Sequence, residues 1–99
     1  MMTKKYTPVP HEIMENTTGQ TFTGKFITFI VTGTWLVQIG NVKFMPGDVY
    51  PWDLQGADGD ISFAPDIKFV EDVSNDPSVL SNKRLKAGKF IEVITLKTA

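Results

Sequence analysis

The fold class is decided by the stretch Phe22-Thr-Gly-Lys-Phe-Ile-Thr-Phe-Ile-Val-Thr-Gly-Thr-Trp-Leu-Val-Gln-Ile-Gly-Asn-Val-Lys-Phe44. β-Branched and aromatic residues fill three runs within it, and two residues separate each run from the next. This pattern is typical of consecutive antiparallel hairpins. Gly40-Asn41 suits a two-residue turn in which glycine takes the first central position with a positive φ, and Thr32-Gly33 is a weaker form of the same signal. The stretch therefore predicts antiparallel β-structure.

Within this stretch, Phe22 to Thr32 is predicted to be one long strand with apolar residues on both of its faces. One face carries Ile27, Phe29 and Val31, and the other carries Phe22, Phe26 and Ile30. Such a strand is covered on both sides, or part of it lies in an interface. Gly24 would allow a bulge or a close approach of another backbone. The next strand is expected to place three residues in the core: Trp35, Val37 and Ile39.

The rest of the chain adds further short strands and one possible helix. Ile61 to Phe69 alternates strictly between apolar and polar residues, so we expect one half-buried strand that lies at an edge or is bulged because of Pro65. Phe90 to Leu96 is expected to be the last strand. Val73 to Gly88 is the one plausible helix, since Asp76-Pro77 provides an N-cap and a first helical residue, and a loop with a single turn is the alternative.

We therefore predict an all-β, mainly antiparallel fold: a small β-sandwich or barrel of about six strands, with an extended N-terminal arm and at most one short helix. A chain of 99 residues is long enough for one domain with a modest core. Residues 1–20 follow neither hydrophobic period and contain Pro8 and Pro10, so we assign them to the extended arm and residues 21–99 to a single β-sandwich domain. The arm either frays or docks on a neighbouring subunit.

The composition is that of an ordinary globular protein, with 41% hydrophobic and 21% charged residues and a formal net charge of −1. This charge gives no global field that would draw the chain to nucleic acid or to an anionic membrane. Cysteine is absent, which excludes disulfides and thiolate metal sites. The sequence shows no secretory signal and no apolar run long enough to span a bilayer, so we expect a soluble protein, made in a cytoplasm, with no membrane partner.

The sequence lacks a catalytic signature. Its one histidine, His11, lies in the predicted arm, whereas a general base needs a fixed position. We therefore assign no catalytic residue and no cofactor. Asp53, Asp58 and Asp60 surround two glycines and are the candidate ligands of a calcium loop. The spacing and the closing glutamate of an EF-hand are missing, and an ordinary hairpin tip uses the same residues, so we take the plain turn as the interpretation.

Two groups of residues are candidates for binding. Tyr50 and Trp52, followed by Asp53, lie in a turn-rich segment, where the two aromatic residues are core residues, interface anchors or a stacking platform. Lys83 and Arg84 belong to a basic cluster within residues 83–89. This cluster is a solvated surface or a docking surface for an acidic neighbour. Nucleic acid is not the expected partner, because no aromatic side chains that could stack on nucleobases are interleaved with these basic residues.

The run Trp35-Leu-Val-Gln-Ile-Gly-Asn-Val-Lys-Phe-Met-Pro-Gly-Asp48 resembles a motif of small virion accessory proteins of tailed bacteriophages. These proteins show a short hairpin followed by Phe-x-Pro-Gly-Asp or a near variant. The proline-containing N-terminal segment is similar to the capsid-docking arms of decoration and head-fibre proteins. The resemblance covers about a third of the chain and assigns no functional residue. It implies a β-rich structural protein that assembles as symmetric copies on a virion.

Three functional hypotheses follow from these observations. The first is a non-enzymatic structural or assembly protein, a homo-oligomer that decorates or stabilises a phage virion, with itself and other virion proteins as partners. Its location would be the virion, after synthesis in the host cytoplasm. The second is a carbohydrate- or peptide-binding β-sandwich that uses Tyr50 and Trp52 beside Asp53. The third, an enzyme, has the least support because no base in a fixed position is found.

Overall fold

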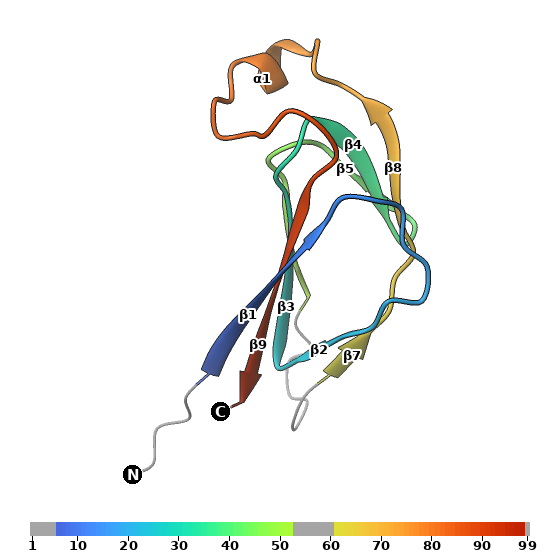
Figure 1. Cartoon of the computed structure of the whole chain (residues 1–99), viewed down its shortest axis with the longest axis vertical. Coiled ribbons are helices and arrows are strands. Elements are labelled where there is room, and N and C mark those ends of the chain that lie inside the picture. Colours follow the sequence, from blue (N-terminus) through green and yellow to red (C-terminus); the bar gives the residue numbers. More distant parts are fainter. Residues whose placement is uncertain (1–5, 53–60, 99) are drawn as a thin grey trace.

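The computed structural model describes residues 6–52 and 61–98, and it confirms the predicted fold class (Figure 1). The fold is mostly antiparallel β-structure arranged as a small sandwich with one short helix. The described residues form nine strands, against the six or so expected. The elements are β1 (Tyr6–Ile13), β2 (Phe22–Gly24), β3 (Phe26–Val31), β4 (Trp35–Ile39), β5 (Val42–Phe44), β6 (Val49–Trp52), β7 (Ile61–Phe63), β8 (Ile67–Asp72), α1 (Pro77–Leu80) and β9 (Ile91–Thr98).

The strands belong to three sheets. A four-stranded sheet has the order β1-β9-β3-β6, a three-stranded sheet has the order β5-β4-β8, and β2 pairs with β7. All of these pairs are antiparallel. In Figure 1 the four-stranded sheet lies on the left with β1 at the front, β4 and β8 lie on the right, and β2 and β7 lie below them. The core lies between these layers.

The core is made by alternate residues of the facing strands. Side chains that are at most 5% exposed come from six strands and form one cluster: Ile13, Phe22, Ile27, Phe29, Val31, Val37, Ile39, Ile67, Phe69, Ile91 and Val93. Aromatic rings meet edge to face within the cluster, with 5.6 Å between the centroids of Phe22 and Phe29. Thr95 is also buried, and its hydroxyl donates to the Val9 carbonyl at 3.3 Å. Burial of each large apolar side chain contributes about 1.5–3 kcal/mol to stability.

The long strand expected over residues 22–32 is in fact two strands in different sheets. The break lies at Lys25, whose N–H donates to the carbonyl of Leu96 at 2.7 Å. A Cβ on Gly24 would lie 3.0 Å from the same oxygen, so glycine lets the two backbones approach. The predicted close approach at Gly24 is confirmed, and the prediction of a single strand is wrong because this contact turns the chain from one sheet to the other.

The two predicted turns have different outcomes. Gly40 has φ 61° and joins β4 to β5 as predicted, with Ile39 opposite Val42. Thr32-Gly33 does not close a hairpin, because β3 and β4 lie in different sheets. The N–H groups of both residues donate instead to the Phe90 carbonyl, at 3.1 and 3.0 Å. This connection crosses between the layers and is held by the segment that precedes β9.

The strand expected over residues 61–69 is also divided, into β7 and β8, at buried Pro65. A register shift between Leu36 and Val37 changes the position of Trp35, which is half-buried at the margin of the core rather than within it. The predicted helix is the single-turn alternative. Asp76 is its N-cap, and the Asp76 carboxylate accepts the N–H of Ser78 at 2.9 Å.

The N-terminal segment is extended, as predicted, but from residue 6 it belongs to the sheets. β1 pairs with β9 over eight residues, from Tyr6 opposite Thr98 to Ile13 opposite Ile91. The next residues bind the other sheet: Asn16 Oδ1 accepts the Phe69 N–H at 2.8 Å, and Thr17 exchanges backbone hydrogen bonds with Ile67. The boundary that we placed at residue 20 therefore has no counterpart in the hydrogen bonding. Residues 1–5 lie outside the described chain.

Candidate functional site

Of the predicted aromatic candidates, Tyr50 lies on the inward face of β6. It is half-buried, and its ring stacks on Phe44 with 5.0 Å between centroids and 24° between planes. Phe29 of the core lies 6.2 Å from the same ring. The backbone of Trp52 pairs with Ile27, and the Trp52 side chain lies outside the described part of the structure. Tyr50 thus joins the two larger sheets at the margin of the core.

The predicted acidic candidates, Asp53, Asp58 and Asp60, lie outside the described residues. Elsewhere, within residues 6–52 and 61–98, no group of three or more His, Cys, Asp or Glu side chains could hold a metal ion. The calcium hypothesis for the loop is therefore untested by this structure.

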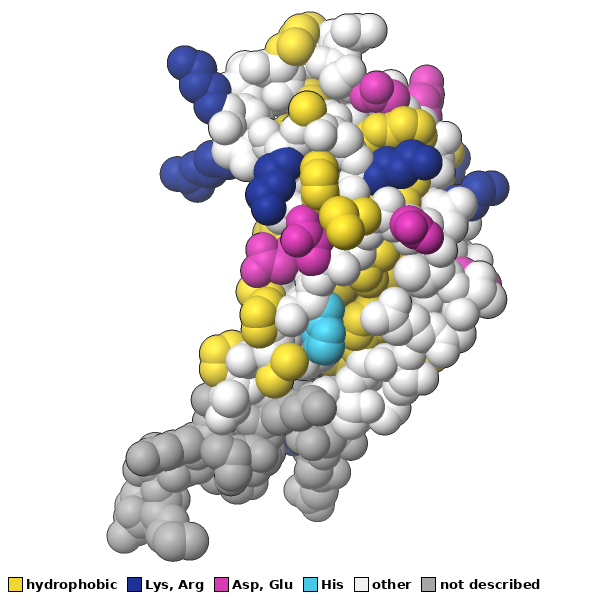
Figure 2. All heavy atoms as spheres, viewed as in Figure 1, with side chains coloured by type: hydrophobic (Ala, Val, Ile, Leu, Met, Phe, Trp, Pro, Cys, Tyr) yellow, Lys and Arg dark blue, Asp and Glu magenta, His cyan; other side chains and the backbone are white. Residues whose placement is uncertain are grey.

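The basic candidates, Lys83 and Arg84, are exposed in the segment between α1 and β9. Neither side chain makes an ion pair with any described residue. Basic side chains project from the upper left of the molecule in Figure 2, near the helix end of the fold in Figure 1. Lys89 of the same segment lies over the ring of Trp35, with 4.6 Å from Nζ to the ring centroid. The segment is therefore a cationic surface attached to the core margin.

This basic segment lies against the Pro46-Gly47-Asp48 turn. The Asn82 side-chain nitrogen lies 3.3 Å from the position of a Cβ on Gly47. The turn itself has a glycine with φ 90°, and the Asp48 carboxylate accepts the N–H of Met45 at 2.8 Å. The structure therefore brings the basic segment next to the turn, while the Tyr50 ring lies on the core side of β6.

A larger surface, which sequence reasoning identified only in part, is the side of the four-stranded sheet that faces away from the core. We call it the outer sheet face. It carries Pro8, Pro10 and Glu12 of β1, Glu92, Ile94 and Leu96 of β9, Phe26, Thr28 and Ile30 of β3, and Val49 and Pro51 of β6. These residues are all exposed or half-buried, and Val49 is 55% exposed. In Figure 1 no described element covers this side of the sheet.

The composition of the outer sheet face is unusual for its position. An antiparallel sheet with one solvated face normally places polar residues there. Here eight of its eleven residues are apolar and three are polar, namely Glu12, Glu92 and Thr28. The apolar positions form two adjoining groups. Pro8, Pro10, Leu96, Ile94 and Phe26 make one, and Ile30, Val49 and Pro51 make the other, with Thr28 and Glu92 between them. Exposed apolar area on a sheet face is a feature of surfaces that contact other molecules.

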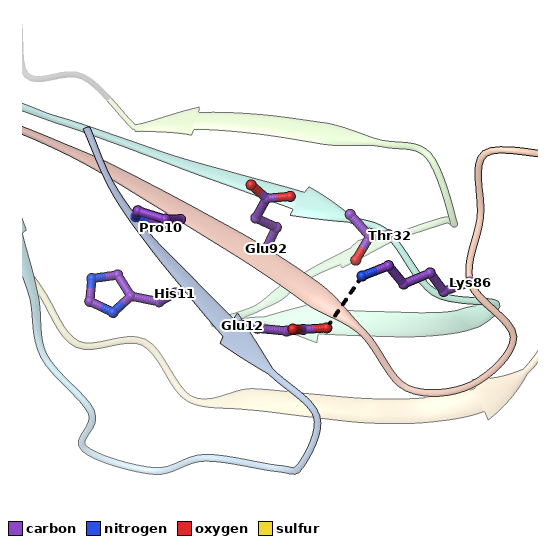
Figure 3. Close-up of a pocket in the computed structure, with 6 residues that line it drawn as sticks. All are labelled: Pro10, His11, Glu12, Thr32, Lys86 and Glu92. Carbon is purple, nitrogen blue, oxygen red and sulfur yellow. Dashed lines mark ion pairs between the residues drawn. The ribbon is translucent and has the colours of Figure 1, made fainter.

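One end of the outer sheet face is charged and hollowed (Figure 3). Glu12 of β1 lies directly opposite Glu92 of β9, and Lys86 Nζ lies 3.7 Å from Glu12 Oε1. A hollow of about 320 Å³ is lined here by Pro10, His11, Glu12, Thr32, Lys86 and Glu92. Like charges directly opposite each other across a strand pair repel, and Lys86 offsets one of the two. The Glu92 carboxylate has no ion-pair partner among the described residues.

His11 does not join these carboxylates. Its ring points to the other side of β1 from Glu92 in Figure 3, toward the core. There it meets Phe22 edge to face, with 5.7 Å between the ring centroids. The hollow therefore combines an exposed carboxylate, a half-buried carboxylate and one lysine, and the His11 ring at its wall is turned toward Phe22.

Comparisons with known proteins add no assignment. No family model, no curated protein and no solved structure matches the chain. None of the described helices has the length and apolar character needed to cross a membrane.

Proposed function

We propose that this chain is a non-enzymatic structural protein that assembles into symmetric homo-oligomers. The observation that supports this proposal is the apolar outer sheet face. Four of its eight apolar side chains are exposed and four are half-buried, so the folded chain gains stability when another protein surface removes them from water. The sequence had placed apolar residues on both sides of residues 22–32, which is the pattern expected of a strand that contributes to an interface.

The resemblance to virion accessory proteins provides the biological setting of this proposal. The run that carries it folds as the β4–β5 hairpin followed by a glycine turn in which Asp48 accepts the Met45 N–H. We propose that the oligomer decorates or stabilises a phage virion, with other virion proteins as its further partners. Binding of the purified protein to virions that lack it would test this setting separately from self-assembly.

The alternative, a carbohydrate- or peptide-binding module, would use Tyr50 and Trp52. Phe44 already stacks on one face of the Tyr50 ring, with 5.0 Å between the two ring centroids. A binding site at this position would therefore depend on the remaining ring surface and on Trp52. Binding of the protein to a glycan panel, lost in Trp52→Ala with the oligomer mass unchanged, would favour this alternative over assembly.

Size-exclusion chromatography with light scattering tests the assembly proposal. We expect a mass that is a whole multiple of the chain mass and that falls toward the single chain on dilution from high to low micromolar concentration. The melting temperature should rise with concentration, because association stabilises the folded chain by mass action. A single-chain mass and an unchanged melting temperature over the whole range would refute it.

A further inference from the structure

We propose that two copies of this chain pack outer sheet face on outer sheet face about a two-fold axis. This inference rests on the proposed assembly function and identifies the surface and the partner. Three features of the molecule support it: the backbone groups at the sheet edges, the charges at one end of the face, and the area of the face.

The free edge of β1 lacks two of the four backbone donors that an added strand would use. Pro8 lies opposite Leu96 and Pro10 lies opposite Ile94 in the β1–β9 pairing. Since proline has no N–H, both prolines occupy non-hydrogen-bonded pairs, in which the two opposite residues exchange no backbone hydrogen bonds. The N–H groups that bond to β9 are therefore those of the odd-numbered residues of β1. Backbone groups at positions 6, 8, 10 and 12 point to the free edge, and of these only Tyr6 and Glu12 can donate.

The opposite edge of the same sheet has the same property. In the β3–β6 pairing, Pro51 lies opposite Thr28 and Val49 lies opposite Ile30. The outward backbone positions of β6 are thus 49 and 51, and only Val49 can donate. Prolines at outward positions prevent pairing of one sheet edge with another. A partner of this sheet therefore covers its face instead of extending its edge.

The charges near the face favour a second copy as that partner. Lys83 and Arg84 lie in the chain between Asn82, which contacts the turn before β6, and Lys86, which pairs with Glu12 of β1. Neither these two residues nor Glu92 has an ion pair among the described residues. Each copy thus carries charges of both signs at the end of the sheet that holds Glu12 and Glu92, and the net charge of the chain is −1. A two-fold axis exchanges the surfaces of the two copies, so acids of one can meet bases of the other twice. A partner with one sign of charge would satisfy only half of them.

The area of the face corresponds to a small, reversible interface. β1 and β9 have eight residues each, β3 has six and β6 has four. At about 3.4 Å per residue and about 4.8 Å between strands they present roughly 420 Å² per copy, or about 850 Å² for the pair. Interfaces below about 1,200 Å² are the weak and reversible ones. Two sheet faces can also approach to about 10 Å with interdigitated side chains, as they do inside a sandwich. We therefore expect dissociation in the micromolar range.

The matched variants Val49→Glu and Val42→Glu test which face is used. Both valines lie in edge strands and are similarly exposed, at 55% and 51%, but Val49 is on the outer sheet face and Val42 is on β5 of the other sheet. A two-fold interface would bury the new carboxylate twice in Val49→Glu. We expect at least a tenfold increase in the dimer dissociation constant for Val49→Glu and no change for Val42→Glu, measured by light scattering on dilution.

A cross-link tests the two-fold axis. The chain has no cysteine, so Ile94→Cys places its only thiol on the central strand β9 of the outer sheet face. A short bismaleimide should join Ile94→Cys to its copy in high yield, whereas Val42→Cys should stay single. A two-fold axis through the middle of the face places the two copies of a central residue such as Ile94 close together, whereas a head-to-tail contact would not give this product.

The outcomes separate the two proposals. If the wild-type protein is a single chain at every concentration, both fail. If it is oligomeric but only Val42→Glu dissociates it, or if Ile94→Cys does not cross-link to its copy, the protein assembles through another surface and this inference alone is overturned. Circular dichroism of each variant shows whether it is folded, and both valines are exposed enough for glutamate to be tolerated in the single chain.

Discussion

At the scale of single residues, tight contacts between backbones hold the layers of this fold together. The closest of these contacts is made by Gly33. A Cβ at this position would lie 2.2 Å from the Gly88 carbonyl oxygen and 2.6 Å from the Phe90 nitrogen. The same residue donates its N–H to the Phe90 carbonyl. The crossing from β3 to β4 therefore depends on the absence of a side chain, and not on the positive φ of a hairpin turn.

Gly33→Ala should lower the free energy of unfolding by about 1–3 kcal/mol, since backbone atoms on both sides must move apart to make room for a methyl group. Urea denaturation would measure this. Gly40→Ala is the comparison: the space around Gly40 is open, and its cost arises from its φ of 61° alone. A Gly33→Ala variant as stable as the wild type would show that the segment before β9 does not hold the crossing.

The Asp76 cap gives a prediction about pH. Hydrogen bonds from the hydroxyl and the N–H of Ser78 hold the pKa of the Asp76 carboxyl below its ordinary value of 3.8. A lowered pKa in the folded state means that the cap stabilises the fold above the unfolded pKa, and that this contribution is lost as the pH falls through the folded pKa. We expect Asp76→Ala to be less stable than the wild type near neutral pH, and this difference to shrink below the unfolded pKa.

Asp76→Asn is the control for this pH effect, because an asparagine oxygen still accepts at the cap but does not titrate. Its stability should stay close to that of the wild type near neutral pH. A difference between wild type and Asp76→Ala that is the same at neutral and acid pH would contradict the assigned role of the carboxylate.

At the scale of elements, the N-terminal strand decides how the sheets are joined. β1 covers one edge of β9, and the residues after it bind β8 of the other sheet through Asn16 and Thr17. Its last residue, Ile13, is 4% exposed within the core, whereas its neighbour Met14 is 55% exposed. The segment that the sequence suggested as an arm is thus part of the folded core.

Ile13→Ala should cost about 2–4 kcal/mol of unfolding free energy, because it leaves a cavity in the core cluster. Met14→Ala, one position further on, should change it by less than about 0.5 kcal/mol. Thermal and urea melts of the two variants give the comparison. Equal and small effects would mean that β1 is not docked, and that the arm interpretation holds after all.

The same elements show what could be predicted from the sequence. The hairpin at Gly40-Asn41 and the cap at Asp76 follow from local chemistry, and both were predicted. Pro65 signalled an irregularity within residues 61–69, and the structure divides the strand there. The division of residues 22–32 could not be predicted, because it depends on a contact with a residue far along the chain. For Gly24 that contact is the carbonyl of Leu96. The periodicity of a strand records which residues are buried, and not which sheet buries them.

At the scale of the whole molecule, the fold has one inward face on each sheet and one apolar outward face. The sequence showed part of this feature: apolar residues on both faces of residues 22–32 indicated a strand that is covered on both sides or that lies partly in an interface. The contribution of Val49, Pro8 and Pro10 required the register of β6 and β1, which no local pattern supplies. The basic residues Lys83 and Arg84 were identified from composition, but their position near this face was not.

The most direct test of the account is the reactivity of a thiol placed on the outer sheet face. Val49→Cys and Val42→Cys each give the chain one cysteine, at positions of nearly equal exposure. The rates of alkylation should be alike at low protein concentration. At high concentration we expect Val49→Cys to become protected by tenfold or more while Val42→Cys keeps its rate. Equal rates for both thiols at all concentrations would contradict the claim that the outer sheet face is the assembly surface.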